Sequence, residues 1–167
     1  MEALTPSFTK IGKDVFSAFM DLEKAYDTND RHGMWHMLRV YGVRRKLLKA
    51  VQSFYVDSRA GVRVENNVSE WFPVNVGLRQ GSVRSPLLFN VYMDGVVREV
   101  NVRVIGKGLE LLCANGGRFE INQLLFADDT ALVADPKEKL YRLVIEFRRV
   151  CNRRKLRVNV RKSKVMR

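Results

Sequence analysis

The sequence predicts an α+β fold in which helices pack on one face of a largely antiparallel sheet. Short apolar runs typical of strands alternate along the chain with segments whose apolar residues recur at helical spacing. No internal repeat, low-complexity tract or Pro/Ser-rich linker interrupts the 167 residues. We therefore expect a single domain over 1–167, with 1–14 as an N-terminal lead-in.

The first strand and the first two helices are predicted from the N-terminal third of the chain. Val15–Leu22 is a nearly continuous apolar run rich in β-favouring residues, which predicts a central strand buried on both faces. Asp21 is its exception. A helix is expected next, ending at Gly42, and a second from about Arg44 to Ser58. The helical spacing of the first is carried by Met34, Met37, Leu38 and Tyr41.

The middle of the chain predicts a hairpin and a longer helix. Polar and apolar residues alternate on both sides of Asn66-Asn67, which marks the turn of a β-hairpin over 62–74. Ser85-Pro86 has the pattern of a helix N-cap followed by proline in the first turn. We expect this helix to continue to Val100, with an exposed ion pair between Asp94 and Arg98.

Two adjacent acids, Asp128 and Asp129, interrupt the apolar run Leu124–Ala134. Apolar arms that flank a polar dipeptide predict a tight hairpin with both carboxylates at its turn. At a separation near 4 Å and an effective dielectric of 20, the two charges repel by about 4 kcal/mol, so the pair needs water or a bound divalent cation. A solvated turn is the alternative interpretation, because Asp is a favoured turn residue.

The C-terminal part predicts a last helix and a last strand. Asp135-Pro136 looks like a capped helix start, with Glu138 as the acid of a capping box. A strand is expected over 164–167. If the strand that holds Asp21 and the hairpin of Asp128-Asp129 share one sheet, three carboxylates can converge at its edge. Such a cluster can bind two Mg²⁺ ions, the arrangement used for nucleotidyl transfer.

Composition points to a polyanionic partner. Thirty Lys and Arg against eighteen Asp and Glu give a net charge of +12, which favours nucleic acid as the partner. Each basic cluster taken separately also fits a solvated helix face. No apolar stretch approaches the roughly 20 residues of a membrane-spanning helix, and no secretory signal is expected. The cysteines, Cys113 and Cys151, indicate neither a disulfide framework nor a zinc site.

Four segments in order resemble motifs A to D of the palm of reverse transcriptases, most closely those of LINE-type, non-LTR retrotransposons. The matching segments are Phe19–Asp27, Gly77–Asn90, Phe126–Asp129, and the set Leu156, Asn159, Lys162 and Ser163 within the motif D region 157–167. The resemblance covers about Val15 to Met166. It implies a polymerase palm-like fold, a ferredoxin-like antiparallel sheet with helices on one face. Fingers and thumb would be largely absent from this chain and supplied by a longer polypeptide.

The resemblance also implies an activity, that of an RNA-directed DNA polymerase. The reaction would transfer deoxynucleotides from dNTPs onto a primer 3′-hydroxyl, with an RNA template and a DNA primer as partners. Asp21, Asp128 and Asp129 would be the catalytic residues. Asp21 and Asp128 would hold two Mg²⁺ ions, for which Mn²⁺ could substitute, and Asp129 would assist as a ligand or orient the pair. The lifestyle of such elements implies a location inside the cell, nuclear or cytoplasmic.

Four further residues gain substrate roles from the resemblance. Tyr26 would press where a ribose 2′-hydroxyl would sit, Gln80 and Gly81 would meet the nucleotide or template, and Lys162 would lie near the triphosphate. Three of them have a simpler structural interpretation: a core tyrosine for Tyr26, a turn glycine for Gly81 and a solvated basic strand end for Lys162.

Two departures from the family pattern support an alternative function. Asn29 and Arg84 stand where relatives usually carry apolar side chains, and a buried unpaired polar group costs roughly 1 to 3 kcal/mol. The alternative is a catalytically inactive, retrotransposon-derived fragment that acts as a nucleic-acid-binding or interaction module. An isolated palm is in any case expected to be a poor polymerase, because affinity for template, primer and nucleotide is shared with the missing parts.

Overall fold

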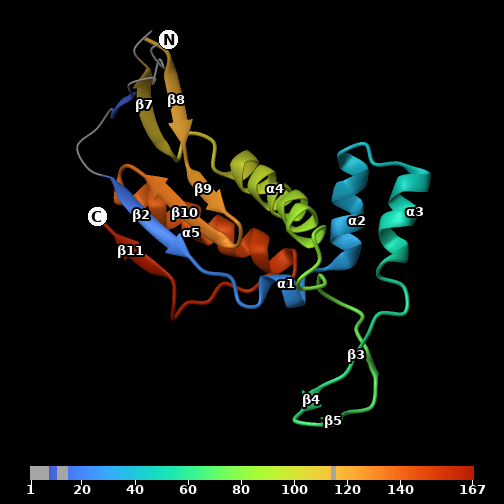
Figure 1. Ribbon diagram of the computed structural model, residues 1–167. Coiled ribbons are helices and arrows are strands. Elements are labelled where there is room, and N and C mark those ends of the chain that lie inside the picture. Colours follow the sequence, from blue (N-terminus) through green and yellow to red (C-terminus); the bar gives the residue numbers. More distant parts are fainter. Residues whose placement is uncertain (1–7, 11–14, 114–115) are drawn as a thin grey trace, which may run out of the picture. The chain divides into compact units, whose positions relative to one another are not determined.

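A computed structural model describes residues 8–10, 15–113 and 116–167 (Figure 1). The chain divides into two compact units. The first combines the residues up to Glu23 with those from Asp94 onward, and the second is the continuous segment Lys24–Met93. Among the described residues, none of the helices combines the length and the apolarity that crossing a bilayer requires.

The main sheet of the first unit is antiparallel, in the order β11-β2-β10-β9. Its strands are β2 (Phe16–Met20), β9 (Gln123–Phe126), β10 (Asp129–Ala134) and β11 (Lys164–Met166). The predicted central position is confirmed, since β2 lies between β10 and β11. The expected burial on both faces is wrong, because Ala18 and Met20 are buried on one face but Phe19 on the other is exposed. The acid hairpin shares its sheet, as expected, because β9 and β10 are its two arms.

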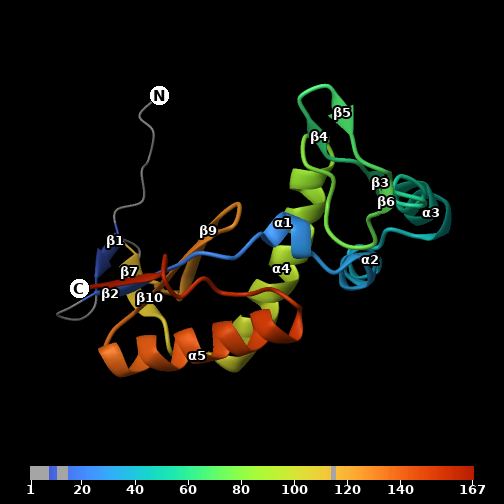
Figure 2. The same cartoon turned by 90° about the horizontal axis from the view of Figure 1, so that it is seen from below.

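Helix α5 (Lys137–Arg153) covers one face of this sheet (Figure 2). Side chains alternate between the faces of a strand, so Ala18 and Met20 of β2 and Leu132 of β10 are buried while Phe19 is 48% exposed. The apolar stripe of α5 fills the other side of this core with Leu140, Leu143, Phe147, Val150 and Cys151. The predicted α+β class, with helices on one face of an antiparallel sheet, is confirmed.

The start of α5 differs from the prediction. Its N-cap residue is Pro136, which makes no side-chain capping hydrogen bond. Proline has no polar side-chain atom that could accept from the first helical N–H groups, so the expected capping box does not form.

A second, three-stranded sheet completes the first unit. It has the order β1 (Phe8–Lys10), β7 (Leu109–Cys113), β8 (Arg118–Ile121) and is antiparallel throughout. The loop before β7 is held by Glu120, whose carboxylate accepts hydrogen bonds from the N–H groups of Gly106 and Gly108 at 3.2 and 2.6 Å. One strand of this sheet therefore comes from the segment expected to be only a lead-in.

Helices make up most of the second unit: α1 (Ala25–Thr28), α2 (Arg31–Val40), α3 (Arg45–Ser53) and the first part of α4 (Ser85–Arg103). Helix α2 ends as predicted before Gly42, which has φ +82°. Helix α3 stops five residues short of the predicted Ser58. The core of the unit contains Met34, Trp35, Met37, Leu38, Leu48, Tyr55, Leu88, Phe89 and Tyr92.

The predicted hairpin over 62–74 is present but its turn is shifted. Strand β4 (Arg63–Val64) pairs with β5 (Asn67–Val68), so the turn residues are Glu65 and Asn66. Beyond them, β3 (Arg59–Ala60) pairs with β6 (Phe72–Pro73). Pro73 therefore lies in a two-stranded ribbon, where both strands are edges.

Candidate active site

Strand register brings Asp21 and Asp129 to the same end of the main sheet. The last pair between β2 and β10 joins Met20 to Thr130. One step further along both strands, Asp21 and Asp129 stand opposite each other. Met20 and Thr130 are buried towards α5. The alternation of side chains therefore turns Asp21 and Asp129 to the sheet face that α5 does not cover.

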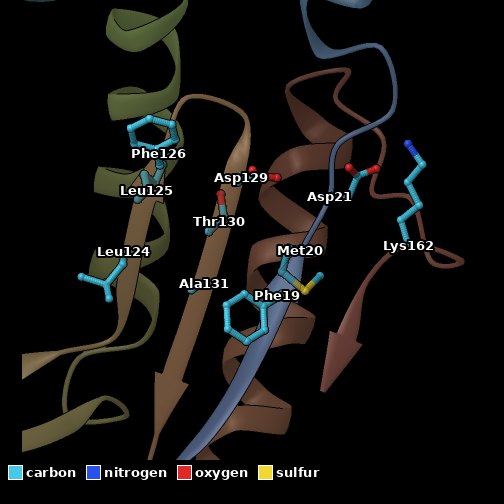
Figure 3. Close-up of a pocket in the computed structure, with 10 residues that line it drawn as sticks. All are labelled: Phe19, Met20, Asp21, Leu124, Leu125, Phe126, Asp129, Thr130, Ala131 and Lys162. Atoms are coloured by element: carbon cyan, nitrogen blue, oxygen red, sulfur yellow. The ribbon is translucent and has the colours of Figure 1, made fainter. Parts of the chain in front are cut away.

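Both acids line a cavity of about 440 Å³ on that face (Figure 3). Lys162 lines it as well, from the segment that precedes β11. Figure 3 shows the Asp21 carboxylate between Asp129 on one side and Lys162 on the other. Apolar and neutral side chains complete the lining: Phe19, Met20, Leu124, Leu125, Phe126, Thr130 and Ala131. The cavity thus combines carboxylate oxygens with one ammonium group on a largely apolar floor.

The segment before β11 fixes the backbone of Asp21 on both sides. Asn159 donates its backbone N–H to the Asp21 carbonyl at 2.8 Å, and the Asp21 N–H donates to Ser163 Oγ at 3.3 Å. Ser163 Oγ in turn donates to the Asn159 carbonyl at 2.8 Å. The sequence singled out Asn159 and Ser163 as part of motif D but gave no indication that they hold Asp21.

Asp128 lies in the turn next to the cavity. Asp129 pairs with Phe126, so the hairpin turn consists of Ala127 and Asp128, with Ala127 at φ +55°. The tight hairpin is confirmed, but Asp129 opens β10 instead of lying in the turn. Asp128 is half-buried and is not among the residues that line the cavity. The structure thus joins Asp21 to Asp129, with Asp128 adjacent in sequence.

The donor set at this end of the sheet fits a divalent cation of the magnesium type. Magnesium is bound in proteins by one or two carboxylates, with water and substrate phosphates completing its shell. Asp21 and Asp129 supply two carboxylates to one cavity. In the described parts of the chain, no group of three or more His, Cys, Asp and Glu side chains is gathered closely enough to hold a metal. A cation here would therefore take water and phosphate oxygens as the rest of its ligands.

The other predicted substrate residues belong to the second unit. The Tyr26 ring is stacked on Phe89 with centroids 4.5 Å apart, and it is half-buried. Gln80 is exposed and donates from Nε2 to Asp27 Oδ1 at 2.6 Å. Gly81 has φ +78° and open space where a Cβ would stand. Their contacts with nucleotide or template stay predictions.

The two departures from the family pattern have different surroundings. Asn29 is completely buried, and neither Nδ2 nor Oδ1 of its side chain has a hydrogen-bond partner among the described residues. Arg84 is exposed, with its guanidinium carbon 3.9 Å from the centroid of the Phe54 ring. Arg84 thus gains a cation–π contact, whereas Asn29 gains nothing from its amide.

The fold and the acid-lined cavity define a palm-type α+β domain. Residues 4–167 match the family model described as "Reverse transcriptase (RNA-dependent DNA polymerase)". The chain therefore belongs to the reverse transcriptase family, whose members generally use divalent metal ions.

Relatives in sequence are polyproteins of non-LTR retrotransposons. The chain is 30% identical over 128 residues to the Pol polyprotein of the type-1 retrotransposable element R2 from Nasonia vitripennis, covering 77% of this chain and 12% of that protein. It is 28% identical to the R2DM polyprotein of Drosophila melanogaster, covering 75% and 11%. These relatives make it a LINE-type reverse transcriptase domain that spans a small part of their length.

Solved structures of similar fold include telomerases. The chain superposes on telomerase from Candida albicans, solved with a fragment of telomeric RNA, with a TM-score of 0.71. The match covers 95% of this chain and 27% of that one at 13% identity. Apo telomerase from Candida tropicalis, truncated of its C-terminal domain, gives 0.68 at 14% identity, covering 91% of this chain and 30% of that one. At such identities the likeness establishes the fold alone.

Proposed function

We propose that this chain is the catalytic palm of an RNA-directed DNA polymerase, one domain over 1–167 that acts in the nucleus or cytoplasm. The observation that carries the proposal is the meeting of Asp21 and Asp129 in one cavity with Lys162. Two carboxylates from adjacent strands and a nearby ammonium group suit a triphosphate held through divalent cations. The proposed partners are an RNA template, a DNA primer and a dNTP.

The acids would serve the transfer of a nucleotide to the primer 3′-hydroxyl. Divalent cations, two Mg²⁺ or in their place Mn²⁺, would when bound activate the attacking hydroxyl and stabilise the leaving oxygen. Asp21 and Asp128 would hold them, as the resemblance implies, and Asp129, which lines the cavity with Asp21, would assist as a ligand or orient the pair. The primer hydroxyl would lose its proton to water, and its oxygen would bond to the α-phosphate as the bond to pyrophosphate breaks. Lys162 would neutralise the triphosphate and donate a proton to the departing pyrophosphate.

Residues of the second unit would select the nucleotide. The Tyr26 ring, fixed by its stacking on Phe89, would exclude a ribose 2′-hydroxyl and so favour deoxynucleotides. Gln80 would contact the nucleotide or template, with its amide oriented by Asp27. Gly81 would let the backbone come close to the ligand, because it carries no side chain.

Primer extension on poly(rA)/oligo(dT) with Mg²⁺ or Mn²⁺ tests the proposal. Asp21→Asn and Asp128→Asn should each lower extension by at least about a hundredfold, because charge stabilisation at a metal site is worth several kcal/mol. Asp57→Asn is the matched control: Asp57 is exposed and has φ +50°, which Asn tolerates. Extension that survives both active-site substitutions would contradict the assignment.

A second readout separates an inactive chain from a wrong site. Mg²⁺ should raise the melting temperature of the wild-type chain, and Asp21→Asn should remove that shift. If no variant extends a primer and Mg²⁺ leaves the melting temperature of a folded wild-type chain unchanged, the nucleic-acid-binding module becomes the better description.

A further inference from the structure

The Arg31 side chain donates hydrogen bonds to backbone carbonyls of two separate segments in the second unit. Its Nε donates to the Gly77 carbonyl at 2.8 Å and its Nη2 to the Val76 carbonyl at 3.2 Å. Nη1 donates to the carbonyls of Val74 and Tyr55 at 2.9 and 3.4 Å. One guanidinium therefore ties the start of α2 to the chain at 74–77 and to the end of the α3 region.

This guanidinium is partly withdrawn from water. Its carbon lies 4.9 Å from the centroid of the Tyr55 ring, within cation–π range. Desolvation by burial is the main cause that lowers the pKa of Arg31. Charged groups in such positions persist where hydrogen bonds replace the lost water, and the carbonyl oxygens do so here.

The segment 74–77, whose carbonyls accept from Arg31, continues directly into the loop of Gln80 and Gly81. Gly77 donates its N–H to the Asn29 carbonyl at 2.9 Å, and Leu78 donates to the Tyr26 carbonyl at 2.8 Å. Gly77 has φ +78°, and a Cβ on it would overlap the backbone carbonyl of Asp27. The loop is thus seated backbone to backbone on the segment that carries Tyr26.

We infer that Arg31 is a positioning residue, which holds the Gly77–Gly81 loop in the conformation that meets the incoming nucleotide. The inference rests on the proposed function, because it takes Gln80 and Gly81 as nucleotide contacts. Among the residues that the structure describes, the Arg31 side chain donates only to backbone carbonyls of its own unit. Lysine keeps the charge but offers one nitrogen, so it cannot reach carbonyls that a planar guanidinium spans.

Amide hydrogen exchange tests the holding of the loop. In Arg31→Lys the amides of Gly77 and Leu78 should exchange about tenfold faster, while those of Met37 and Leu38 inside α2 keep their rates. Arg39→Lys makes the same chemical change at an exposed position of the same helix and should alter neither set. Arg31→Gln, which keeps a shorter amide donor, should behave like Arg31→Lys.

Two exchange results would overturn the inference. One is unchanged exchange at Gly77 and Leu78 in both Arg31 variants. The other is equal acceleration throughout α2, which would make Arg31 a general stabiliser of the unit.

Steady-state extension tests the consequence for the nucleotide. Arg31→Lys should raise the KM for dNTP about tenfold and change kcat far less, because the acids that do the chemistry are untouched. Wild-type kinetics in a variant with a loosened loop would overturn the positioning role. Failure of the wild-type chain to extend any primer, together with a melting temperature that Mg²⁺ leaves unchanged, would instead refute the proposed function. Exchange would still decide whether Arg31 holds the loop.

Discussion

Asn29 carries a side-chain amide that its surroundings do not satisfy. Its side chain is fully buried, and its amide nitrogen and oxygen both lack hydrogen-bond partners among the described residues. Its backbone carbonyl, by contrast, accepts from Gly77. The position therefore needs the main chain of residue 29 but makes no use of its amide group.

Replacing Asn29 by an apolar residue of similar size should stabilise the chain. We expect Asn29→Leu to raise the free energy of unfolding by about 1–2 kcal/mol, because it removes the desolvation cost of the amide. Urea denaturation measures the change. Asn75→Leu, at an exposed position, is the control and should stay within about 0.5 kcal/mol of the wild type. A loss of stability in Asn29→Leu would mean that the amide is needed for packing or has a partner.

Cys151 should be chemically silent in the folded chain. Burial raises the pKa of its thiol to about 12, so almost no thiolate exists near pH 8. In a Cys113→Ser variant, which leaves Cys151 as the single thiol, a disulfide reagent at pH 8 should react only as fast as the chain unfolds. Urea should accelerate the reaction in step with unfolding. Rapid reaction of the native variant would contradict the burial.

The pKa of Cys151 also sets a pH dependence. The folded chain keeps the thiol proton to a higher pH than the unfolded chain, whose thiol has a pKa near 9. The corresponding stability is fully present below pH 9 and is lost as pH rises towards 12. Cys151→Ala should flatten this part of the stability curve.

Within the Gly77–Gly81 loop, the two glycines differ in what surrounds them. Both have φ +78°, but only at Gly77 would a Cβ meet backbone atoms, those of Tyr26 and Asp27. Gly81→Ala should cost about 1–2 kcal/mol of unfolding free energy from left-handed strain alone. Gly77→Ala should cost at least about 2 kcal/mol more, because a backbone segment must move. Equal losses in thermal unfolding would refute this difference.

Helix α5 is held to the sheet by its apolar stripe. Phe147 is fully buried, so Phe147→Ala should lower the free energy of unfolding by about 3–5 kcal/mol. Tyr141 on the same helix is 67% exposed, and Tyr141→Ala should change it by less than about 1 kcal/mol. A similar loss in both variants by urea denaturation would show that α5 is not anchored through this stripe.

Helices and strands whose apolar residues recur at regular spacing were predictable from the sequence, but the residues at which they end were not. The central strand, α2 and the acid hairpin follow from apolar spacing that stands in the sequence itself. The predicted end of α3 at Ser58 is wrong because Tyr55 continues the apolar spacing of the helix. Asp57, at φ +50°, cannot belong to a helix. The predicted capping box at the start of α5 is wrong because the N-cap residue is Pro136 and not an acid.

The candidate site was predictable in its residue types but not in its arrangement. Asp21, Asp128 and Asp129 stand out because acids interrupt apolar runs. Which of the two hairpin acids faces Asp21 depends on strand register, which no local pattern reveals. The hydrogen bonds of Asn159 and Ser163 to the Asp21 backbone could not be predicted either, since they join segments far apart in sequence.

At the scale of the whole molecule, the net charge of +12 should make nucleic-acid binding strongly salt-dependent. For single strands the logarithm of the binding constant falls by about 0.7 per neutralised phosphate for each tenfold rise in salt. Three or more contacts would weaken binding about tenfold or more between about 50 and 200 mM KCl. Fluorescence anisotropy with a labelled RNA measures the slope. Binding that is indifferent to salt would rule out a phosphate-dominated interface.

The central place of β2 in its sheet sets an order of events during synthesis. Phe19 of β2 pairs with Ala131 on one side and Lys164 on the other, so this strand has no partner until the ribosome has made more than a hundred further residues. The continuous segment Lys24–Met93 emerges in the meantime and can compact first. Because such distant pairings close slowly, the nascent chain carries an unpaired apolar strand while the residues between β2 and β10 are translated. That interval is when it most needs protection from aggregation.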